Sequence, residues 1–340
     1  MTTPSVQANV SLTAFNTFGI AARARSYVEI HDVEQLRAML RPRNPSERFL
    51  VLGGGSNLLL TQDFSGLALR IKLIGKNIVA RDDDTTFVEV AAGENWHDFV
   101  RWTVDQQLAG LENLSLIPGT VGASPIQNIG AYGVELKDYF HSLQAVNVAD
   151  GSMRRFDRDE CEFAYRDSVF KRALKDRYVI TSVTFRLPHK VKLHLEYGDV
   201  RDELETMGCV NPIARDVSDA VCAIRRRKLP DPAVIGNAGS FFKNPIVEQE
   251  VLTRIQSIHE SVPHYSAPAG KVKLAAGWLI EQCGWKGKSL GRAGVHGQHA
   301  LVLVNRGGAT GAELIALARA IQTSVREKFF VDLEPEPVIV

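Results

Sequence analysis

A glycine-rich, largely apolar segment, Leu116–Gly133, constrains the fold of this chain more than any other feature. Its glycines recur every few residues and two prolines interrupt it, so it fits neither a regular helix nor a strand. Its apolar residues favour burial, which would leave backbone N–H groups without ladder partners. A ligand phosphate is a natural acceptor for such groups, because missing side chains let the backbone approach it closely. The alternative is a compact structural loop.

A second glycine cluster, Gly53–Asn57, directly follows the apolar run 48–52, which reads as a short buried strand. A strand that runs into a glycine turn commonly presents backbone amides to a diphosphate. The cluster is not the G-x-G-x-x-G fingerprint, because Leu58 stands where the third glycine is needed. No Gly-Lys-Ser/Thr follows, so it is not a P-loop either. Alone the cluster is equally compatible with an ordinary turn, but two such loops favour a bound nucleotide cofactor.

Composition indicates a soluble globular protein of two or three domains, since the 340 residues are 45% hydrophobic and 23% charged. A net charge of +1 gives no indication of nucleic acid or an anionic membrane as a partner. The four cysteines lie far apart without a C-x-x-C pattern, which argues against disulfides and zinc and predicts a cytoplasmic protein. Met1–Val10 has no signal-peptide pattern, and no apolar run approaches the roughly 18 residues of a membrane span. We expect no metal, no membrane insertion and no obligate protein partner.

Hydrophobic periodicity predicts a mixture of helices and strands, that is, an α+β protein. Strands are expected over 26–31, 48–52, 67–73, 87–91, 143–148, 153–156, 178–187, 191–195 and 300–304. Helices are expected over 33–40, 95–108, 214–228, 247–259, 275–283 and 314–329. A polar linker is expected after about residue 200, and an extended tail over 331–340.

Eight motifs, in this order along nearly the whole chain, resemble the UDP-N-acetylenolpyruvoylglucosamine reductase family, whose members are also called UDP-N-acetylmuramate dehydrogenases. The motifs are Asn16–Ile20, Gly53–Asn57, Ile117–Gly133, Tyr165–Ser168, Tyr197–Asp199, Lys228–Pro232, Asn237–Pro245 and Leu333–Glu336. The Tyr197 motif resembles the subclass that has an extra substrate-covering loop.

The resemblance implies a fold and a reaction. The fold is a vanillyl-alcohol-oxidase/PCMH-type FAD-binding region of two α+β subdomains, 1–75 and 76–205, followed by an α+β substrate-binding domain, 206–332. A tail, 333–340, carries Glu336 and can return to the first subdomain. The implied reaction is reduction of UDP-N-acetylglucosamine enolpyruvate to UDP-N-acetylmuramate in peptidoglycan precursor synthesis. It uses noncovalent FAD, with NADPH as the reducing co-substrate.

The resemblance also implies binding residues. FAD contacts are expected in the two glycine loops, at Gly53, Gly54, Gly55, Ser56, Asn57, Ile117, Pro118, Gly119, Gly122, Ala123, Ile129, Tyr132 and Gly133. Substrate or NADPH contacts are expected at Tyr197, Arg225, Lys228, Asn244, Tyr265 and His299. Two positions depart from the family pattern: His299 stands where close relatives often have glutamine, and Pro337 replaces an aliphatic residue.

Three residues, Ser240, Arg166 and Glu336, match the family's catalytic positions. The reaction needs a hydride from flavin N5 to the vinyl carbon, stabilisation of the resulting enolate, and a proton at the adjacent carbon. Ser240 matches the proton donor, and Arg166 can hold the substrate carboxylate in a bidentate geometry. Glu336, between two prolines, can polarise the enolate or take part in proton supply. Considered without the resemblance, Ser240 is better interpreted as an ordinary turn residue and Glu336 as a solvated tail acid. The alternative for Arg166 is a structural ion pair with Asp167 or Asp159.

Two other function classes compete with this interpretation. One is a different flavin oxidoreductase on the same fold, acting on an alcohol or a lactone. The other is a catalytically silent flavin- or nucleotide-binding protein. The joint presence of the three catalytic matches argues against both, because a fold alone does not supply them.

Overall fold

The computed structural model describes residues 4–41, 47–197 and 199–340. They form two compact units. The first unit comprises the described parts of Met1–Val10, Ala24–Gly54 and Ser65–Arg227, and the second comprises Ser11–Arg23, Gly55–Phe64 and Lys228–Val340. Within these described ranges, no helix has the length and apolar character that crossing a membrane requires.

The amino-terminal sheet of the first unit has four strands in the order β1-β2-β5-β3. The strands are β1 (Gln7–Ser11), β2 (Arg23–Ile30), β3 (Phe49–Leu52) and β5 (Phe64–Ile71). Helix α1 (Val33–Leu40) packs Leu36 and Leu40 into the same apolar cluster as β2 and β5. Asp32 caps this helix by accepting a hydrogen bond from Gln35 N at 2.7 Å. The helix predicted over 33–40 is therefore confirmed.

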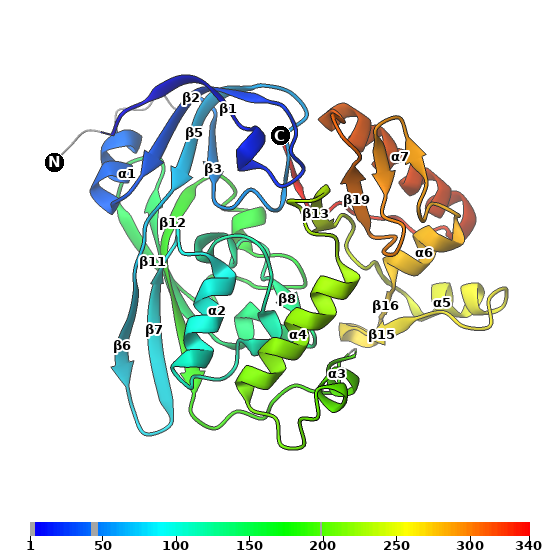
Figure 1. The fold of residues 1–340 in the computed structure, drawn as a ribbon. Coiled ribbons are helices and arrows are strands. Elements are labelled where there is room, and N and C mark those ends of the chain that lie inside the picture. The colour runs from blue at the N-terminus through cyan, green and yellow to red at the C-terminus, as the bar shows by residue number, and fades with distance from the viewer. Residues whose placement is uncertain (1–3, 42–46, 198) are drawn as a thin grey trace. The chain divides into compact units, whose positions relative to one another are not determined.

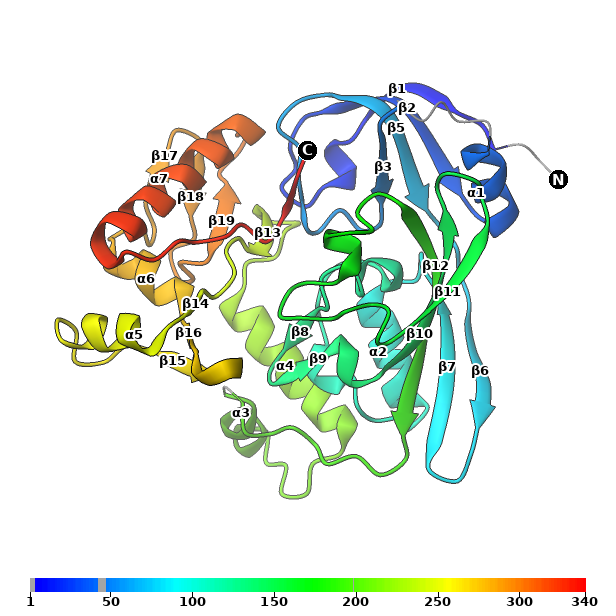
Figure 2. The same cartoon turned by 180° about the vertical axis from the view of Figure 1, so that it is seen from behind.

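The larger sheet of the first unit is antiparallel, with the order β11-β10-β12-β7-β6 (Figure 2). Its strands are β6 (Lys76–Arg81), β7 (Thr85–Ala91), β10 (Phe140–Asn147), β11 (Met153–Asp157) and β12 (Tyr178–Pro188). Helix α2 (Trp96–Asp105) packs Trp96 and Phe99 against Phe185 of β12. Strand β6 was not predicted from the sequence. It is an edge strand whose side chains are mostly exposed, so its sequence shows no alternation of apolar and polar residues.

Two further helices complete the first unit, α3 (Val200–Thr206) and α4 (Ala214–Lys228). Helix α4 runs beside α2 (Figure 1), and Arg101 of α2 forms an ion pair with Asp219 of α4 at 2.5 Å. Helix α3 was predicted as polar linker, because only two of its side chains, Val200 and Leu204, are buried.

The strand predicted over 191–195 is wrong. These residues have no regular structure, and Leu193 and Leu195 pack against the apolar cluster of α3 and α4. Their alternating apolar pattern therefore reflects packing against two helices and not a position in a sheet. Gly198, which contributed to the expected turn after Tyr197, lies outside the described residues.

The second unit contains two small antiparallel sheets, ordered β13-β19-β18-β17 and β14-β16-β15. Their strands are β13 (Gly236–Ser240), β14 (Ile246–Val247), β15 (His264–Ser266), β16 (Val272–Leu274), β17 (Ser289–Leu290), β18 (Ala293–Val295) and β19 (Val302–Asn305). The helices of this unit are α5 (Gln249–Gln256), α6 (Ala276–Gln282) and α7 (Gly311–Phe329). All three helices were predicted, with bounds that differ by a few residues.

The carboxyl-terminal tail returns to an early part of the chain within the second unit. Strand β20 (Val338–Ile339) pairs in parallel with β4 (Leu58–Leu59). Val340 O accepts hydrogen bonds from Thr61 N at 2.7 Å and Thr61 Oγ1 at 2.8 Å. The tail is thus extended, as its prolines suggested, and it is fixed in place. The three-domain division at 75 and 205 stays a prediction.

Candidate active site

The residues predicted to form the site are divided between the two units. The first unit holds Gly53, Gly54, the glycine-rich segment Leu116–Gly133, Arg166, Tyr197 and Arg225. The second unit holds Gly55, Ser56, Asn57, Lys228, Ser240, Asn244, Tyr265, His299 and Glu336.

Within the first unit, Gly53 and Gly54 lie against Gly119 and Thr120 of the glycine-rich segment. A Cβ atom on Gly54 would lie 2.8 Å from Gly119 Cα, and one on Gly53 would lie 2.4 Å from Thr120 Oγ1. The backbone of Gly119 leaves no room for a side chain on residue 54, so this contact requires Gly54. A side chain on residue 53 would require the Thr120 hydroxyl to move. The sequence predicted that the absence of side chains at these glycines would let a ligand approach the backbone. In the structure it also lets Gly53–Gly54 and the glycine-rich segment approach each other.

Backbone hydrogen bonds fix the glycine-rich segment to the turn after β7. Val121 N donates to Glu94 O and Gly122 N donates to Ala92 O, both at 2.9 Å. The Glu94 side chain is buried and forms an ion pair with Lys76 Nζ at 2.6 Å. Two of the amides that the sequence offered to a ligand phosphate are therefore already used within the protein.

Three residues of the glycine-rich segment that are not glycine adopt left-handed backbone conformations. They are Leu116 (φ 58°), Asn128 (φ 45°) and Tyr132 (φ 48°). Asn128 is buried, and its side chain donates to Ala164 O and accepts from Lys137 N, both at 3.0 Å. Such conformations persist only where surrounding contacts enforce them, and they concentrate at binding sites.

Arg166 lies in a tight turn whose ends, Ala164 and Asp167, exchange two backbone hydrogen bonds of 3.0 and 3.2 Å. Arg166 Nη2 donates to Gly130 O at 2.5 Å. A Cβ on Gly130 would lie 2.9 Å from Arg166 Nη1, so the guanidinium rests directly against the segment's backbone. Asp167, one of the ion-pair partners considered for Arg166, pairs with Arg172 at 2.8 Å.

Arg225, in the last turn of α4, places a second cation near the same segment. Its half-buried guanidinium donates from Nε to Leu116 O at 3.3 Å and also hydrogen-bonds the Tyr132 side chain. Burial lowers the pKa of Arg225, and the charge of Arg166 lowers it further. Among the described residues, the groups that act most strongly on Arg225 include no carboxylate. Two cations beside a glycine-rich backbone suit an anionic ligand.

Tyr197 packs against the other end of the glycine-rich segment. A Cβ on Gly133 would lie 3.3 Å from Tyr197 Cβ, and 38% of Tyr197 is exposed. The buried Asn113 side chain donates to Tyr132 O at 3.0 Å and to His194 O at 2.8 Å. Asn113 therefore ties the irregular segment that carries Tyr197 to the glycine-rich segment.

In the second unit, Ser240 ends strand β13 opposite Val302. A register shift between Asn237 and Ser240 marks a bulge, in which Gly239 has φ 68°. Asn237 Oδ1 accepts from Gly239 N at 2.9 Å, which holds the bulge in shape. Bulges redirect the side chains that follow them. The half-buried Ser240 is thus a strand-end residue and not a simple turn residue.

The carboxyl-terminal tail, 333–340, forms an extended arm that places Glu336 next to the end of β13. Glu336 N donates to Phe241 O at 2.8 Å, and Lys243 N donates to Glu334 O at 2.9 Å. Asn57 contacts the same arm, since its Nδ2 donates to Glu336 O at 3.3 Å. Within the second unit, Ser240 and Glu336 therefore belong to neighbouring backbone strands that are hydrogen-bonded directly after Ser240.

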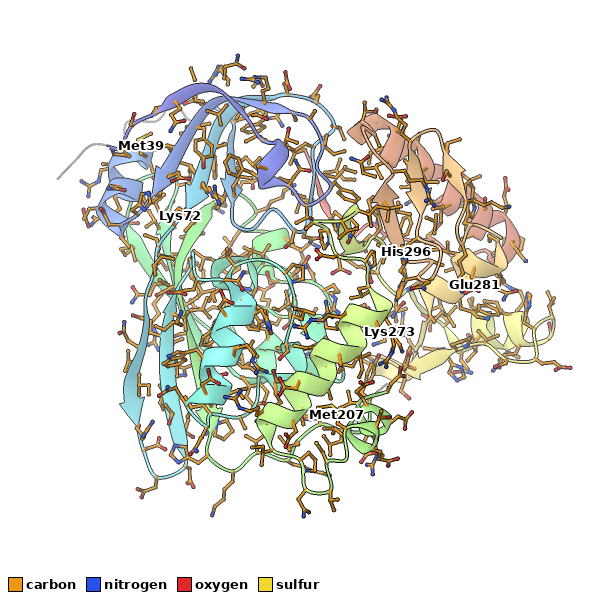
Figure 3. The ribbon with its side chains drawn as sticks, viewed as in Figure 1. Met39, Lys72, Met207, Lys273, Glu281 and His296 are labelled. Atoms are coloured by element: carbon orange, nitrogen blue, oxygen red, sulfur yellow. The ribbon has the colours of Figure 1, made fainter. Side chains whose placement is uncertain are left out.

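The remaining predicted residues of the second unit lie in different surroundings. The Nδ1 atom of His299 is buried with no hydrogen-bond partner among the described residues. Burial lowers the pKa of His299, and the charges of His296 and Lys228 lower it further. His296, labelled in Figure 3, also has a lowered pKa, from burial and Arg306.

Asn244 and Tyr265 are both engaged within the unit. The Asn244 Oδ1 atom accepts a hydrogen bond of 2.9 Å from Ala276 N at the start of α6. This bond occupies the side-chain oxygen and does not involve the side-chain NH₂ group of Asn244. Tyr265 is 41% exposed, and Lys273 Nζ lies 5.5 Å from its ring centroid. Lys273, labelled in Figure 3, adds a cation that sequence analysis did not consider.

Two residues that shape the site were missed as site residues. Asn237 carried a usable signal, because an asparagine two positions before a glycine is typical of a local side-chain-to-backbone turn. Asn113 carried none, since its partners, Tyr132 and His194, are distant in sequence.

Family models match both ends of the chain. A model of the C-terminal domain of UDP-N-acetylenolpyruvoylglucosamine reductase matches residues 231–340, and a model of an FAD binding domain matches residues 24–157.

Several bacterial relatives match almost the whole chain. UDP-N-acetylenolpyruvoylglucosamine reductase from Burkholderia cenocepacia (strain HI2424) is 56% identical over 330 residues, which is 96% of this chain and 95% of the relative. The protein of the same name from Burkholderia ambifaria (strain MC40-6) is 55% identical over 332 residues, which is 97% of this chain and 95% of the relative.

Solved structures show the same fold. The reductase from Thermus caldophilus superposes with a TM-score of 0.70 at 22% identity and covers 99% of both chains. A solvent-stable cholesterol oxidase superposes with a TM-score of 0.50 at 11% identity, over 98% of this chain and 87% of the oxidase.

Proposed function

The chain belongs to the UDP-N-acetylenolpyruvoylglucosamine reductase family, and on that premise we propose how its own residues divide the work of the reaction. The motif resemblance and the expected α+β flavin-binding fold are both confirmed. The protein is an FAD-dependent oxidoreductase that reduces the enolpyruvyl group of UDP-N-acetylglucosamine enolpyruvate in peptidoglycan synthesis.

The first unit offers a cradle that fits the FAD diphosphate. Gly53 and Gly54 lie against Thr120 and Gly119 of the glycine-rich segment, which leaves backbone exposed to a close ligand. Arg166 and Arg225 are hydrogen-bonded to the same segment, at Gly130 O and Leu116 O, and each has a separate proposed role. We assign the FAD contacts to the predicted residues of these loops, without a covalent bond. When bound, FAD supplies the hydride chemistry, and we propose NADPH as its reductant.

Arg166 is proposed to bind the substrate carboxylate. Its guanidinium is always charged and presents a planar fork of donors, which matches a carboxylate in a bidentate geometry. Negative charge that spreads into the carboxylate during reduction is stabilised by the same contact. Arg166→Lys keeps the charge but loses the fork, so we expect turnover to fall severely while FAD binding persists. A near-normal turnover number in this variant would remove Arg166 from the active site.

Ser240 is proposed to donate the proton from Oγ to the carbon next to the one that receives the hydride. A serine hydroxyl is a weak acid in water, so this step requires a strongly basic enolate and a site that excludes water. The observation that supports the assignment is the bulge before Ser240, together with the arm that carries Glu336 alongside it.

Glu336 is proposed to act on the enolate region or on the proton supply of Ser240. Its backbone N–H is bound to Phe241 O, so its position relative to the strand that carries Ser240 is fixed by main-chain bonds. Glu336→Gln keeps the shape and removes the charge. We expect this variant to bind FAD normally and to turn over slowly.

Lys228, Asn244, Tyr265, His299, Arg225 and Tyr197 are proposed as contacts to the sugar nucleotide or NADPH. For Tyr197, 38% exposure at the end of an irregular segment suits a residue that covers bound substrate. Tyr197→Phe should then raise KM more than it lowers kcat. We also propose a cytoplasmic location, which the free thiols of Cys161, Cys209, Cys222 and Cys283 support.

One experiment distinguishes this function from its two rivals. The protein is reduced by NADPH without oxygen and mixed with UDP-N-acetylglucosamine enolpyruvate, while flavin absorbance and product mass are followed. Rapid reoxidation with formation of UDP-N-acetylmuramate supports the proposal. Reoxidation only by an alcohol-derived or lactone-derived acceptor indicates a different oxidoreductase, and reoxidation by neither indicates a silent binding protein.

A further inference from the structure

The entrance to the glycine-rich segment is held in an unfavourable backbone conformation. Leu116, its first residue, has φ 58°, a region that residues with a side chain rarely adopt. Ile117, Pro118 and Gly119, which follow it, are the first predicted FAD contacts of the segment. Whatever stabilises the Leu116 backbone therefore also sets the position of those residues.

Two helices hold the Leu116 residue by its backbone from both sides. His97, near the start of α2, accepts a hydrogen bond at Nδ1 from Leu116 N at 2.9 Å. Arg225, near the end of α4, donates from Nε to Leu116 O at 3.3 Å. The Leu116 amide and carbonyl are thus both bound by side chains, and neither bond belongs to regular secondary structure.

The bond to His97 fixes the protonation state of its ring. A backbone N–H can only donate, so Nδ1 must be unprotonated and the proton of the neutral ring lies on Nε2. Nε2 lies 4.0 Å from Cys222 Sγ, a weak acceptor, on α4. Protonation of His97 at Nδ1 would turn an acceptor into a donor that faces another donor, and the bond to Leu116 would be lost.

The groups around His97 favour the neutral ring. On α2, Arg101 opposes protonation and Asp98 favours it; on α4, Arg225 and Arg226 oppose it. Burial, the strongest influence, lowers the pKa of the half-buried His97 below its ordinary value of 6.5, and these cations outnumber the single carboxylate.

We propose that His97 is a positioning residue for the cofactor: as a neutral imidazole it holds Leu116 in the conformation that lets the glycine-rich segment bind FAD. This rests on the proposed function, in which that segment cradles the FAD diphosphate. The consequence is that FAD affinity depends on the protonation of a residue that does not itself touch the cofactor.

The sign of the pH effect follows from the lowered pKa of His97. The neutral form is complete above the ordinary value of 6.5, where the bond to Leu116 is intact. As pH falls through the lowered pKa, the ring becomes charged and the bond is lost. FAD affinity should therefore be constant at neutral pH and fall in acid.

The test is FAD binding to apoprotein, measured by flavin fluorescence between about pH 5 and pH 8. His97→Asn keeps an acceptor, Oδ1, close to the position of Nδ1 but does not titrate. His97→Gln moves its acceptor away from Leu116. His141→Asn is the matched control, because His141 is also in the first unit with a pKa lowered by burial, but it lies on β10 beside Arg155.

We expect wild type and His141→Asn to lose FAD affinity in acid. His97→Asn should bind FAD as wild type does at neutral pH and keep that affinity in acid. At neutral pH, His97→Gln should bind FAD on the order of tenfold more weakly than wild type, because the Leu116 N–H is left without its acceptor. Its affinity should not change with pH, so wild type should fall towards it in acid. If His97→Gln does not fold, the flat pH profile of His97→Asn still decides the matter.

Two failures have different meanings. If His97→Asn loses FAD in acid as wild type does, His97 does not position the segment, whereas the proposed function stands. If wild-type apoprotein takes up no FAD at any pH, the proposed function itself is wrong.

Discussion

At the scale of single residues, the position of Ser240 depends on its neighbours in the bulge. Gly239 adopts φ 68° and Asn237 holds it there through its side chain, so the register shifts before Ser240 pairs with Val302. The serine hydroxyl is chemically ordinary. Its proposed role follows from where the bulge and the Glu336 arm place it.

Replacing Ser240 with alanine should separate the two halves of the catalytic cycle. The hydroxyl is needed only when a proton reaches the substrate carbon. NADPH should therefore bleach the flavin at a near-normal rate, whereas reoxidation by substrate should slow by roughly 10²–10⁴-fold, as expected for loss of a positioned proton donor. Stopped-flow absorbance measures each half-reaction. Equal slowing of both would mean that Ser240 shapes the flavin site.

Gly239→Ala tests the bulge itself. Nothing lies within 4 Å of the added Cβ, so the variant suffers backbone strain of about 1 kcal/mol without a clash. Relief of that strain should rotate Ser240 and slow reoxidation by substrate. Gly208→Ala is the matched control, since Gly208 has φ 74° and similarly open space but lies after α3. Both variants should lose similar stability in urea, and normal reoxidation in Gly239→Ala would show that the bulge does not position Ser240.

At the scale of elements, α7 shows how local signals decide a boundary. Thr310 accepts from Glu313 N at 3.2 Å while Glu313 Oε2 accepts from Thr310 N at 2.8 Å, which is a complete capping box. At the other end, Phe330 has φ 55° and terminates the helix. The helix contacts β17, β18 and β19, and β19 pairs with β13, the strand that carries Ser240.

The capping box of α7 should make part of the protein's stability acid-sensitive. The backbone bond from Thr310 and the bond from Arg292 lower the pKa of Glu313 from 4.5 to about 2. A lowered pKa means that the stabilisation is complete above 4.5 and disappears as pH falls towards 2. Glu313→Gln should therefore melt below wild type at neutral pH, and the difference in Tm should close over that acid range. A difference in Tm between wild type and Glu313→Gln that stays constant down to pH 2 would show that the Glu313 carboxylate is not the source of the acid sensitivity.

The limits of sequence-based prediction are clearest in these same elements. Helices α1 and α7 were predictable because caps and apolar spacing agree, and α4 because two prolines follow its basic last turn. Strand β13 was not, because Gly236–Ser240 has a bulge and little apolar alternation. The strand expected over 191–195 failed because its apolar residues pack on helices.

The candidate site was predictable only in part, for a related physical reason. Its residue identities came from motifs, but their contacts join distant parts of the chain. Examples are the bond that Asn113 donates to His194 and the bond that Leu116 N donates to His97, since no local pattern encodes either of them.

At the scale of the whole molecule, neither unit is a continuous stretch of chain. The second unit takes in Ser11–Arg23 and Gly55–Phe64 as well as the carboxyl-terminal residues. Asn305 Nδ2 donates to Phe18 O at 2.9 Å in a buried contact, and a Cβ on Gly236 would lie 2.2 Å from the same oxygen. A fragment limited to 231–340 would lack these contacts, so the family domain and the physical unit have different limits.

The intact protein should be yellow when purified and should hold one FAD without a covalent bond. The motivation is the pair of glycine loops and the FAD-binding domain match over 24–157. Acid precipitation should release the flavin into the supernatant. Added FAD should raise the Tm of the apoprotein, by mass action on the native state. Colour that stays with the pellet would contradict noncovalent binding.

The pairing of β20 with β4 also has a consequence for how the chain is made. Val340, whose carbonyl oxygen accepts the hydrogen bonds of Thr61, is synthesised 279 residues after Thr61. At synthesis rates of about 5–20 residues per second, the interval between the synthesis of Thr61 and that of Val340 is roughly 15 to 55 seconds. We expect chains stalled on the ribosome before residue 338 to be cleaved readily near Leu58–Leu59, whereas released chains resist. A truncated message would leave this short strand as an open edge, available to another unfinished chain.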